Sequence, residues 1–171
     1  MVTEEFGPET WDNIREKAGM EDEIFISNQG YPDEVTYTLV SVTSEVLKQP
    51  VDTILEQFGI YWVMKVAKVE YGELMTSHGI GLGEFLDHLP NFHSRLEMIF
   101  PNFKPPRFKV ANRQNTSLEL YYYTHREGLA RFVVGIILGL GQLYETAVSV
   151  DHIVSRADTG DHDVYSISWA D

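Results

Sequence analysis

The chain has 171 residues, 43% hydrophobic and 23% charged, which is typical of one globular domain with a buried core. Its 26 acidic and 13 basic residues give a formal net charge of −13, which argues against nucleic acid and anionic membrane as partners. It has no cysteine, which excludes disulfides and cysteine-based zinc sites. It also has no signal peptide or apolar stretch of membrane-spanning length, so we expect a cytoplasmic protein.

Helices are predicted throughout the first part of the chain. The first covers 8–18, and a second covers 33–48 with Asp33 as a plausible cap. A third runs from 51 to about 71, with apolar residues at helical spacing. The glycine-rich stretch 77–83 lacks the lysine of a phosphate-binding loop and is expected to be a connection.

The next helix carries His93 on its apolar face. We expect a short helix over 83–89, followed by a separate helix that begins at Pro90 and ends at Pro101. A histidine in an apolar region must form hydrogen bonds or bind a metal, and on burial statistics the hydrogen-bonded core histidine is commoner. The apolar residues that share its face are Leu89, Leu96, Ile99 and Phe100.

The second half is predicted to contain strands around one long helix, and this order indicates the α+β class. The expected elements are strands over 104–113, 117–124, 148–155 and 164–169 and a helix over 127–144. Gly135 and Gly139 lie four residues apart in that helix, which permits close approach of a neighbouring backbone. His152 and His162 flank the last turn without metal-ligand spacing, so a solvated loop is expected there.

One face of the second predicted strand changes from apolar to hydrogen-bonding residues. In order, this face carries Leu118, Leu120, Tyr122, Thr124 and Arg126. Phenol, hydroxyl and guanidinium donors in a row suit a carboxylate, although an edge strand that ends in solvent is the simpler alternative. Combined with an inward histidine and an apolar cavity, such a carboxylate clamp describes the requirements of haem.

These residues give the chain its resemblance to H-NOX domains, the haem nitric oxide/oxygen-binding fold of bacterial gas sensors and soluble guanylate cyclase. The matching motifs are the Y-x-T-x-R triplet, F-G-P-E-T-W-D-N-I near the start, F-G-I-Y-W at 58–62 and G-D-H-D near the end. The resemblance implies that His93 ligates the iron of haem b and that Pro106 presses on the porphyrin. It also implies that Tyr122, Thr124 and Arg126 bind the propionates, with Thr124 replacing the family's serine.

The resemblance also implies an architecture. A helical subdomain of residues 1 to about 65 would pack on a subdomain of about 66–171 with a small antiparallel sheet, and the haem would lie between them. The family pattern begins with a further helix over the distal side of the haem, and Met1 falls where that helix would be ending. This difference favours, as an alternative, a haem-free protein-interaction module.

The choice of gas is predicted from the distal side of the haem. Aligned on V-V-G-I-I, the tyrosine that stabilises oxygen in oxygen-binding H-NOX proteins falls on Phe132, which cannot donate a hydrogen bond. We therefore expect binding of NO and CO, with weak or absent oxygen binding. The indole N–H of Trp62 is the donor that would instead make this an oxygen-binding haem protein.

A sensor of this kind must signal to another protein. By resemblance, the partner is a histidine kinase, a cyclic-nucleotide enzyme or a chemotaxis receptor. No catalytic constellation is visible in the chain, so it is not expected to be an enzyme itself. The alternative from another class is a small metal-dependent hydrolase that uses the six histidines.

Overall fold

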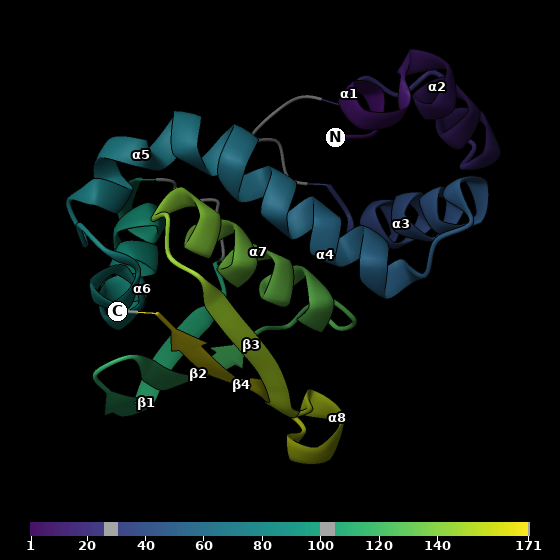
Figure 1. Ribbon diagram of the computed structural model, residues 1–171. Helices are drawn as coiled ribbons and strands as arrows, with labels where there is room; N and C mark the ends of the chain where they lie inside the picture. Colours follow the sequence, from purple (N-terminus) through teal and green to yellow (C-terminus); the bar gives the residue numbers. More distant parts are fainter. Residues whose placement is uncertain (26–30, 100–104, 171) are drawn as a thin grey trace.

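The computed structural model describes residues 1–25, 31–99 and 105–170. Its first part is helical: α1 (Val2–Phe6), α2 (Pro8–Lys17), α3 (Asp33–Leu47), α4 (Val51–Tyr61), a π-helical segment (Trp62–Ala67), α5 (Lys68–Thr76) and α6 (Leu82–Ile99). Its second part contains β1 (Arg107–Gln114), β2 (Ser117–Tyr123), α7 (Ala130–Leu143), β3 (Val148–Val154), α8 (Arg156–Thr159) and β4 (His162–Trp169). This arrangement confirms the predicted α+β class (Figure 1).

The strands form one antiparallel sheet in the order β1-β2-β4-β3, and α7 packs against it (Figure 1). The predicted alternation along β2 is confirmed, because Leu118, Leu120 and Tyr122 are buried and their neighbours are not. Tyr165 and Ile167 of β4 join them in the main hydrophobic core. Burial of this face fixes the register of β2, since a slip by one residue would turn every apolar side chain outward.

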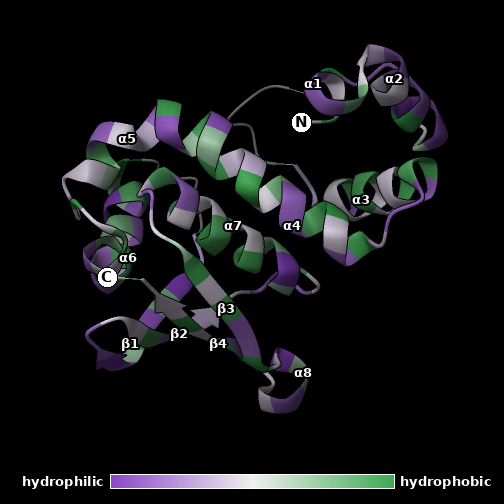
Figure 2. Ribbon diagram, in the orientation of Figure 1, coloured by the Kyte–Doolittle hydropathy of each residue, from purple (hydrophilic) through white to green (hydrophobic). Residues whose placement is uncertain are grey.

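Helices α4 and α7 lie along one another and form the next layer (Figure 1). The predicted close approach at the glycines is confirmed. A Cβ atom on Gly135 would lie 2.1 Å from the carbonyl oxygen of Glu56, and one on Gly59 would lie 2.5 Å from that of Phe132. Both helices therefore need glycine at their crossing. Figure 2 shows α7 mainly in the hydrophobic colour, whereas the more peripheral α2 carries many hydrophilic residues.

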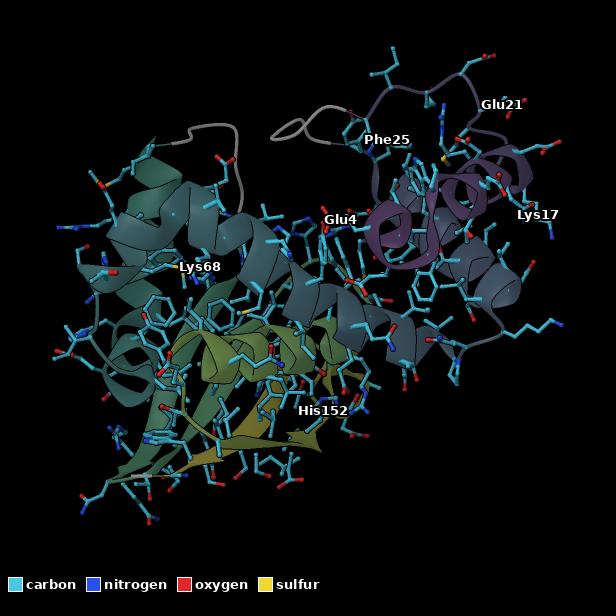
Figure 3. The ribbon with its side chains drawn as sticks, turned by 45° about the horizontal axis from the view of Figure 1, so that its top comes forward. Glu4, Lys17, Glu21, Phe25, Lys68 and His152 are labelled. Carbon is cyan, nitrogen blue, oxygen red and sulfur yellow. The ribbon has the colours of Figure 1, made fainter. Side chains whose placement is uncertain are left out.

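The N-terminal helices α1–α3 gather at one end of the molecule and reach the rest through α4 (Figures 1 and 3). The short α1 contributes no buried residue, and α2 buries only Ile14 among the described residues. Glu4 of α1 accepts a hydrogen bond from the hydroxyl of Tyr61, at the end of α4. Burial and this carboxylate together raise the pKa of Tyr61. A short helix thus does precede Pro8 and contacts α4.

The helix that carries His93 differs from the prediction. A single helix, α6, continues through Pro90, whereas the sequence suggested a break there. Proline lacks the N–H that would bond to the carbonyl four residues earlier, so it normally ends a helix. Here the buried residues follow an unbroken helical spacing on both sides of the proline, and their burial outweighs the lost hydrogen bond. These residues are Leu82, Phe85, Leu86, Leu89, Phe92 and Leu96.

Several predicted boundaries also shift. The helix expected to end near 71 continues to Thr76 through the π-helical segment, which no sequence pattern marked. Asp33 is the first residue of α3 rather than its cap, which is Pro32. Gly128 has φ 73°, outside the helical region, so α7 starts at Ala130. The positions predicted for Phe100, Pro101 and Lys104 lie outside the described residues.

Candidate functional site

His93 lies on α6 with one ring nitrogen already bonded. Its Nδ1 is 3.1 Å from the carbonyl oxygen of Leu89, and its ring centroid is 4.8 Å from that of Phe108. Burial lowers the pKa of His93 to about 4, so the imidazole is neutral at pH 7. The hydrogen bond requires the proton on Nδ1, which leaves Nε2 with a free lone pair. An imidazole oriented through Nδ1 in this way has the form that metals bind.

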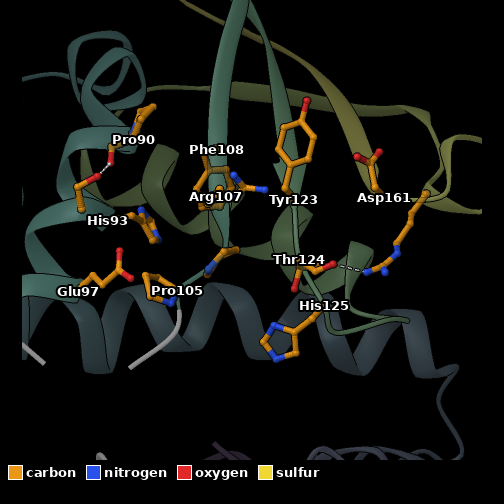
Figure 4. Close-up of a pocket in the computed structure, with 13 residues that line it drawn as sticks. Pro90, His93, Glu97, Pro105, Arg107, Phe108, Tyr123, Thr124, His125 and Asp161 are labelled. Atoms are coloured by element: carbon orange, nitrogen blue, oxygen red, sulfur yellow. Dashed lines mark hydrogen bonds between the residues drawn. The ribbon is translucent and has the colours of Figure 1, made fainter. Parts of the chain in front are cut away.

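His93 opens onto a pocket of about 580 Å³ (Figure 4). The lining comes from α6, the proline pair before β1, the ends of β1 and β2, and the α8 region. Its residues are Pro90, His93, Ser94, Glu97, Pro105, Pro106, Arg107, Phe108, Tyr123, Thr124, His125, Arg156 and Asp161. The structure thus brings together three of the residues singled out from the sequence: His93, Pro106 and Thr124.

Tyr122 lies immediately behind the pocket. Its side chain is buried on the inner face of β2, with its ring centroid 5.4 Å from that of Phe108. Burial raises the pKa of Tyr122, and its hydrogen bond with Thr124 partly offsets this effect. The hydroxyl oxygen of Thr124 also accepts the backbone N–H of Arg126 at 3.0 Å. Tyr122 and Thr124 therefore form a connected pair of hydroxyl groups, and Thr124 lines the pocket onto which His93 opens.

Arg126 follows them in the chain, but its guanidinium faces α3. Its Nε is 2.7 Å from Oδ1 of Asp33, and its Nη2 donates to the hydroxyl of Thr36 at 3.0 Å. The hydroxyl of Tyr37 donates to the carbonyl of Glu127 at 3.0 Å. The loop after β2 is thereby attached to the N-terminal helices. Sequence reasoning placed Arg126 in a clamp for carboxylates and had no means of finding Asp33 as its partner.

Trp62 and Phe132 lie in the layer formed by α4 and α7, outside the pocket lining. Trp62 begins the π-helical segment, and its ring centroid is 6.4 Å from that of Tyr71. The ring of Phe132 on α7 packs against Phe58 on α4 at 5.3 Å between centroids. The structure thus places the two residues expected on the distal side in a separate layer from His93.

Two polar groups near the pocket were not anticipated from sequence. Arg156 lines the pocket and donates from Nη1 to the carbonyl of Thr124. Asp163 is buried, and its Oδ1 is 2.8 Å from Nε2 of His152. The expectation of a solvated loop around His152 is therefore wrong, because β3 and β4 bring this pair together below the surface. Among the described residues, no group of three or more histidines and carboxylates could hold a metal ion.

Comparison with known proteins identifies the family. A family model described as haem-NO-binding matches residues 1–152. The chain belongs to the haem-NO-binding (H-NOX) family. Its members are haem-based gas-sensor domains, and they include the domain found in soluble guanylate cyclases.

The curated relatives are longer than this chain. Soluble guanylate cyclase gcy-31 of Caenorhabditis elegans is 27% identical over 151 residues, which cover 88% of this chain and 22% of that protein. Soluble guanylate cyclase gcy-32 of the same organism is 31% identical over 140 residues, covering 80% and 20%. This H-NOX chain thus spans about a fifth of the length of these relatives.

Solved structures share the fold. An H-NOX protein from S. oneidensis in the Fe(II)NO state aligns with a TM-score of 0.87 at 17% identity, covering 100% of this chain and 94% of that one. The Fe(II) unliganded H-NOX protein from K. algicida aligns at 0.85 with 20% identity, covering 99% and 91%. In the described ranges of this H-NOX chain, no helix has the length and apolar character needed to cross a membrane.

The residues of this H-NOX chain fit a haem. The neutral imidazole of His93 lines a pocket, and no described residue forms a hydrogen bond with its Nε2; Thr124 and two arginines line the same pocket. A histidine nitrogen suits iron, and hydroxyl and guanidinium donors suit the carboxylates of a haem's propionates. The donor set therefore matches both ends of the cofactor that the family binds.

Proposed function

We propose that this H-NOX domain senses NO and CO through haem b, with Nε2 of His93 as the protein ligand to the iron. The observation that carries the proposal is the state of His93: a neutral imidazole, held through Nδ1 by Leu89, with Nε2 at a pocket. Membership of the haem-NO-binding family supports it. The alternatives, a haem-free interaction module and a small metal-dependent hydrolase, have no comparable feature among the described residues.

The propionate side of the site is proposed to be Tyr122, Thr124 and Arg126, as the family resemblance implies. Thr124 lines the same pocket as His93, and Tyr122 shares a hydrogen bond with Thr124. Arg126 belongs to the same short segment, since its backbone N–H donates to the hydroxyl of Thr124. Its ion pair with Asp33 would then connect the haem's carboxylate end to α3.

Selectivity for gas is proposed to depend on the absence of a donor at Phe132. Bound oxygen carries partial negative charge and needs a hydrogen-bond donor, whereas ferrous NO and CO depend on one much less. Phe132 and its neighbour Phe58 present hydrocarbon rings to each other. The Trp62 indole packs on the side of Tyr71. We therefore infer weak or absent oxygen binding.

Signalling is proposed to proceed through α6 and Pro106. When bound, the haem supplies an iron site for a diatomic gas and a bond to His93 that NO weakens. His93 and Pro106 line the same pocket and would both contact the haem, so a weaker bond to His93 would loosen the middle of α6 and the chain before β1. This shift acts as a switch only if NO favours one of the two conformations, and a partner protein must then read it.

The partner is inferred to be a signalling protein. Two relatives are soluble guanylate cyclases, which supports a cyclic-nucleotide enzyme as the partner domain; a histidine kinase and a chemotaxis receptor are the other candidates. The chain itself is proposed to sense rather than to catalyse. A cytoplasmic location agrees with such partners.

Substitution of His93 tests the proposal. Replacement by glycine should abolish the Soret band of the purified protein, and free imidazole should restore it by occupying the vacated place. The control is His88→Gly, because His88 is an exposed histidine five residues earlier on the same helix. A His93→Gly protein that keeps the spectrum of the parent would exclude His93 as the ligand.

A further inference from the structure

Arg156 is a pocket residue to which the family resemblance gave no role. It is the first residue of α8, in the connection between β3 and β4. It lines the same pocket as His93, Pro106 and Thr124. Figure 4 shows Thr124 in the middle of this pocket, with a dashed line for the hydrogen bond that Arg156 donates to its carbonyl. The guanidinium of Arg156 thus contacts Thr124, one of the residues proposed to bind the propionates.

The backbone of Arg156 is held in place from within the fold. Its N–H donates to Oδ1 of Asp163 at 3.0 Å, and the same oxygen lies 2.8 Å from Nε2 of His152. Asp163 is only 5% exposed, so this carboxylate is a buried anchor. Ser155 caps the start of α8, because its hydroxyl accepts the N–H of Ala157 at 3.2 Å. Pre-organisation of this kind is what a binding residue needs.

The guanidinium of Arg156 is only weakly neutralised by the protein. Among the described residues, its guanidinium forms an ion pair with Glu127, at 4.0 Å from Nη2 and with a side chain that is 82% exposed. Its Nη1 donates to a neutral carbonyl. Arg126 differs, because Asp33 lies 2.7 Å from its Nε and Thr36 accepts from its Nη2. The positive charge of Arg156 is therefore less neutralised by protein carboxylates than that of Arg126, and it is more available to a bound anion.

The other charged residues that line the pocket have contacts elsewhere or lie on other elements. Arg107 lies over the ring of Tyr123, 5.8 Å from its centroid. The carboxylate of Asp161 is hydrogen-bonded with Nδ1 of His162 at 2.5 Å. Glu97 is on α6, one turn beyond His93, and His125 follows Thr124 in the chain. A carboxylate bound next to Thr124 would lie within reach of the guanidinium of Arg156, which already contacts that residue.

We propose that Arg156, positioned by Asp163, binds a propionate carboxylate of the haem. The proposal rests on the proposed function, because it needs haem in the pocket. A guanidinium binds carboxylates with paired N–H donors. Among the described residues, the carbonyl of Thr124 is the one group that accepts from the guanidinium of Arg156, which has five N–H donors. Its contact with Thr124 places this charge beside the proposed clamp hydroxyls.

The test compares haem with its dimethyl ester, in which both propionates are uncharged. Haem release from the holoprotein to excess apomyoglobin is timed for the parent and for Arg156→Gln, with each of the two haems. Arg156→Gln should speed release of haem about tenfold and leave release of the ester nearly unchanged, because the ester has no carboxylate for Arg156 to bind. Arg95→Gln is the control, since it removes the same charge from an exposed position on α6 outside the pocket lining, and it should change both rates little.

The outcomes separate the possible failures. Equal acceleration for both haems would show that Arg156 acts only by holding the carbonyl of Thr124, and no acceleration would show that it does not contribute; either overturns the proposal. If the glutamine protein does not fold, Arg156→Lys is measured instead, and it should speed release of haem severalfold without affecting the ester. A parent protein that binds neither haem would overturn the proposed function itself.

Discussion

Arg126 and Asp33 form an ion pair between segments that are far apart in the sequence, with 2.7 Å between Nε and Oδ1. It connects the loop after β2 to the first turn of α3, and Thr36 adds a hydrogen bond 3.0 Å long. Through this contact, the N-terminal helices are attached beside Thr124, whose hydroxyl binds the backbone of Arg126. The proposed clamp for haem is therefore also a joint between the two parts of the chain.

Removal of the charge on Asp33 tests this joint. Asp33→Asn should lower the free energy of unfolding by up to about 1 kcal/mol, because both partners are partly exposed and such pairs contribute little. Urea unfolding of the holoprotein measures the change. Glu34→Gln is the matched control, since Glu34 is exposed in the same first turn of α3. Equal losses for the two variants would mean that the charge acts on the helix end alone, without the ion pair.

The crossing of α4 and α7 gives a second prediction. Gly135→Ala should destabilise the protein by about 3 kcal/mol, because the new methyl group would overlap the backbone of Glu56, which cannot move as a side chain can. Gly72→Ala is the control, since Gly72 lies inside α5 and a Cβ there would meet no atom within 4 Å. It should be neutral or stabilising by up to about 1 kcal/mol. Thermal unfolding of both variants measures the change, and a Gly135→Ala protein as stable as the parent would contradict the close approach of α4 and α7.

Acid should destabilise the haem-free protein partly through His93. Burial lowers its pKa from 6.5 to about 4, so between these pH values the unfolded chain binds a proton that the folded chain does not. The neutral imidazole makes its full contribution to the free energy of unfolding above pH 6.5. As pH falls toward 4, the free energy of unfolding decreases by an amount on the order of 3 kcal/mol.

The measurement compares the parent with His93→Leu. Urea unfolding of both haem-free proteins at about pH 7 and about pH 4.5 gives the loss of stability for each. The parent should lose more, because only it carries the buried base. Identical losses would show that His93 is not protected from protonation in the fold.

A hydroxyl at position 132 should change the choice of gas. Phe132→Tyr adds a donor on α7, so the reduced protein should form an oxygen adduct in air that the parent does not form. Phe108→Tyr is the control, since it adds the same hydroxyl next to His93, where the ring centroids are 4.8 Å apart. The two variants are compared by the position of the Soret band in air. An oxygen adduct with Phe108→Tyr but not with Phe132→Tyr would contradict the assignment of the distal side.

Local patterns were sufficient for much of the fold. The alternation of Leu118, Leu120 and Tyr122 predicted the buried face of β2, and two glycines predicted the close approach of α7 to a neighbour. The break predicted at Pro90 was wrong, because the core contacts of α6 outweigh one missing hydrogen bond. The local rule for proline carries no information on how much apolar surface the same helix buries.

The candidate site was only partly predictable for a similar reason. His93 stood out because a polar ring occupied an apolar helical face, which is a local signal. The partner of Arg126 lies on α3, and Arg156 reaches the pocket only because β4 pairs with β2 and places α8 beside Thr124. Contacts of this kind depend on the three-dimensional arrangement, and neither composition nor spacing contains them.

The most direct test of the proposed gas sensor is the absorption spectrum of the reduced protein, taken under argon, then with NO, and separately in air. We predict a Soret band under argon that shifts with NO and does not shift in air, because His93 would hold the haem and Phe132 cannot donate a hydrogen bond to bound oxygen. Absence of a Soret band, even after haem is added, would contradict the central claim that this chain is a haem-based sensor. A shift in air would contradict the predicted discrimination against oxygen.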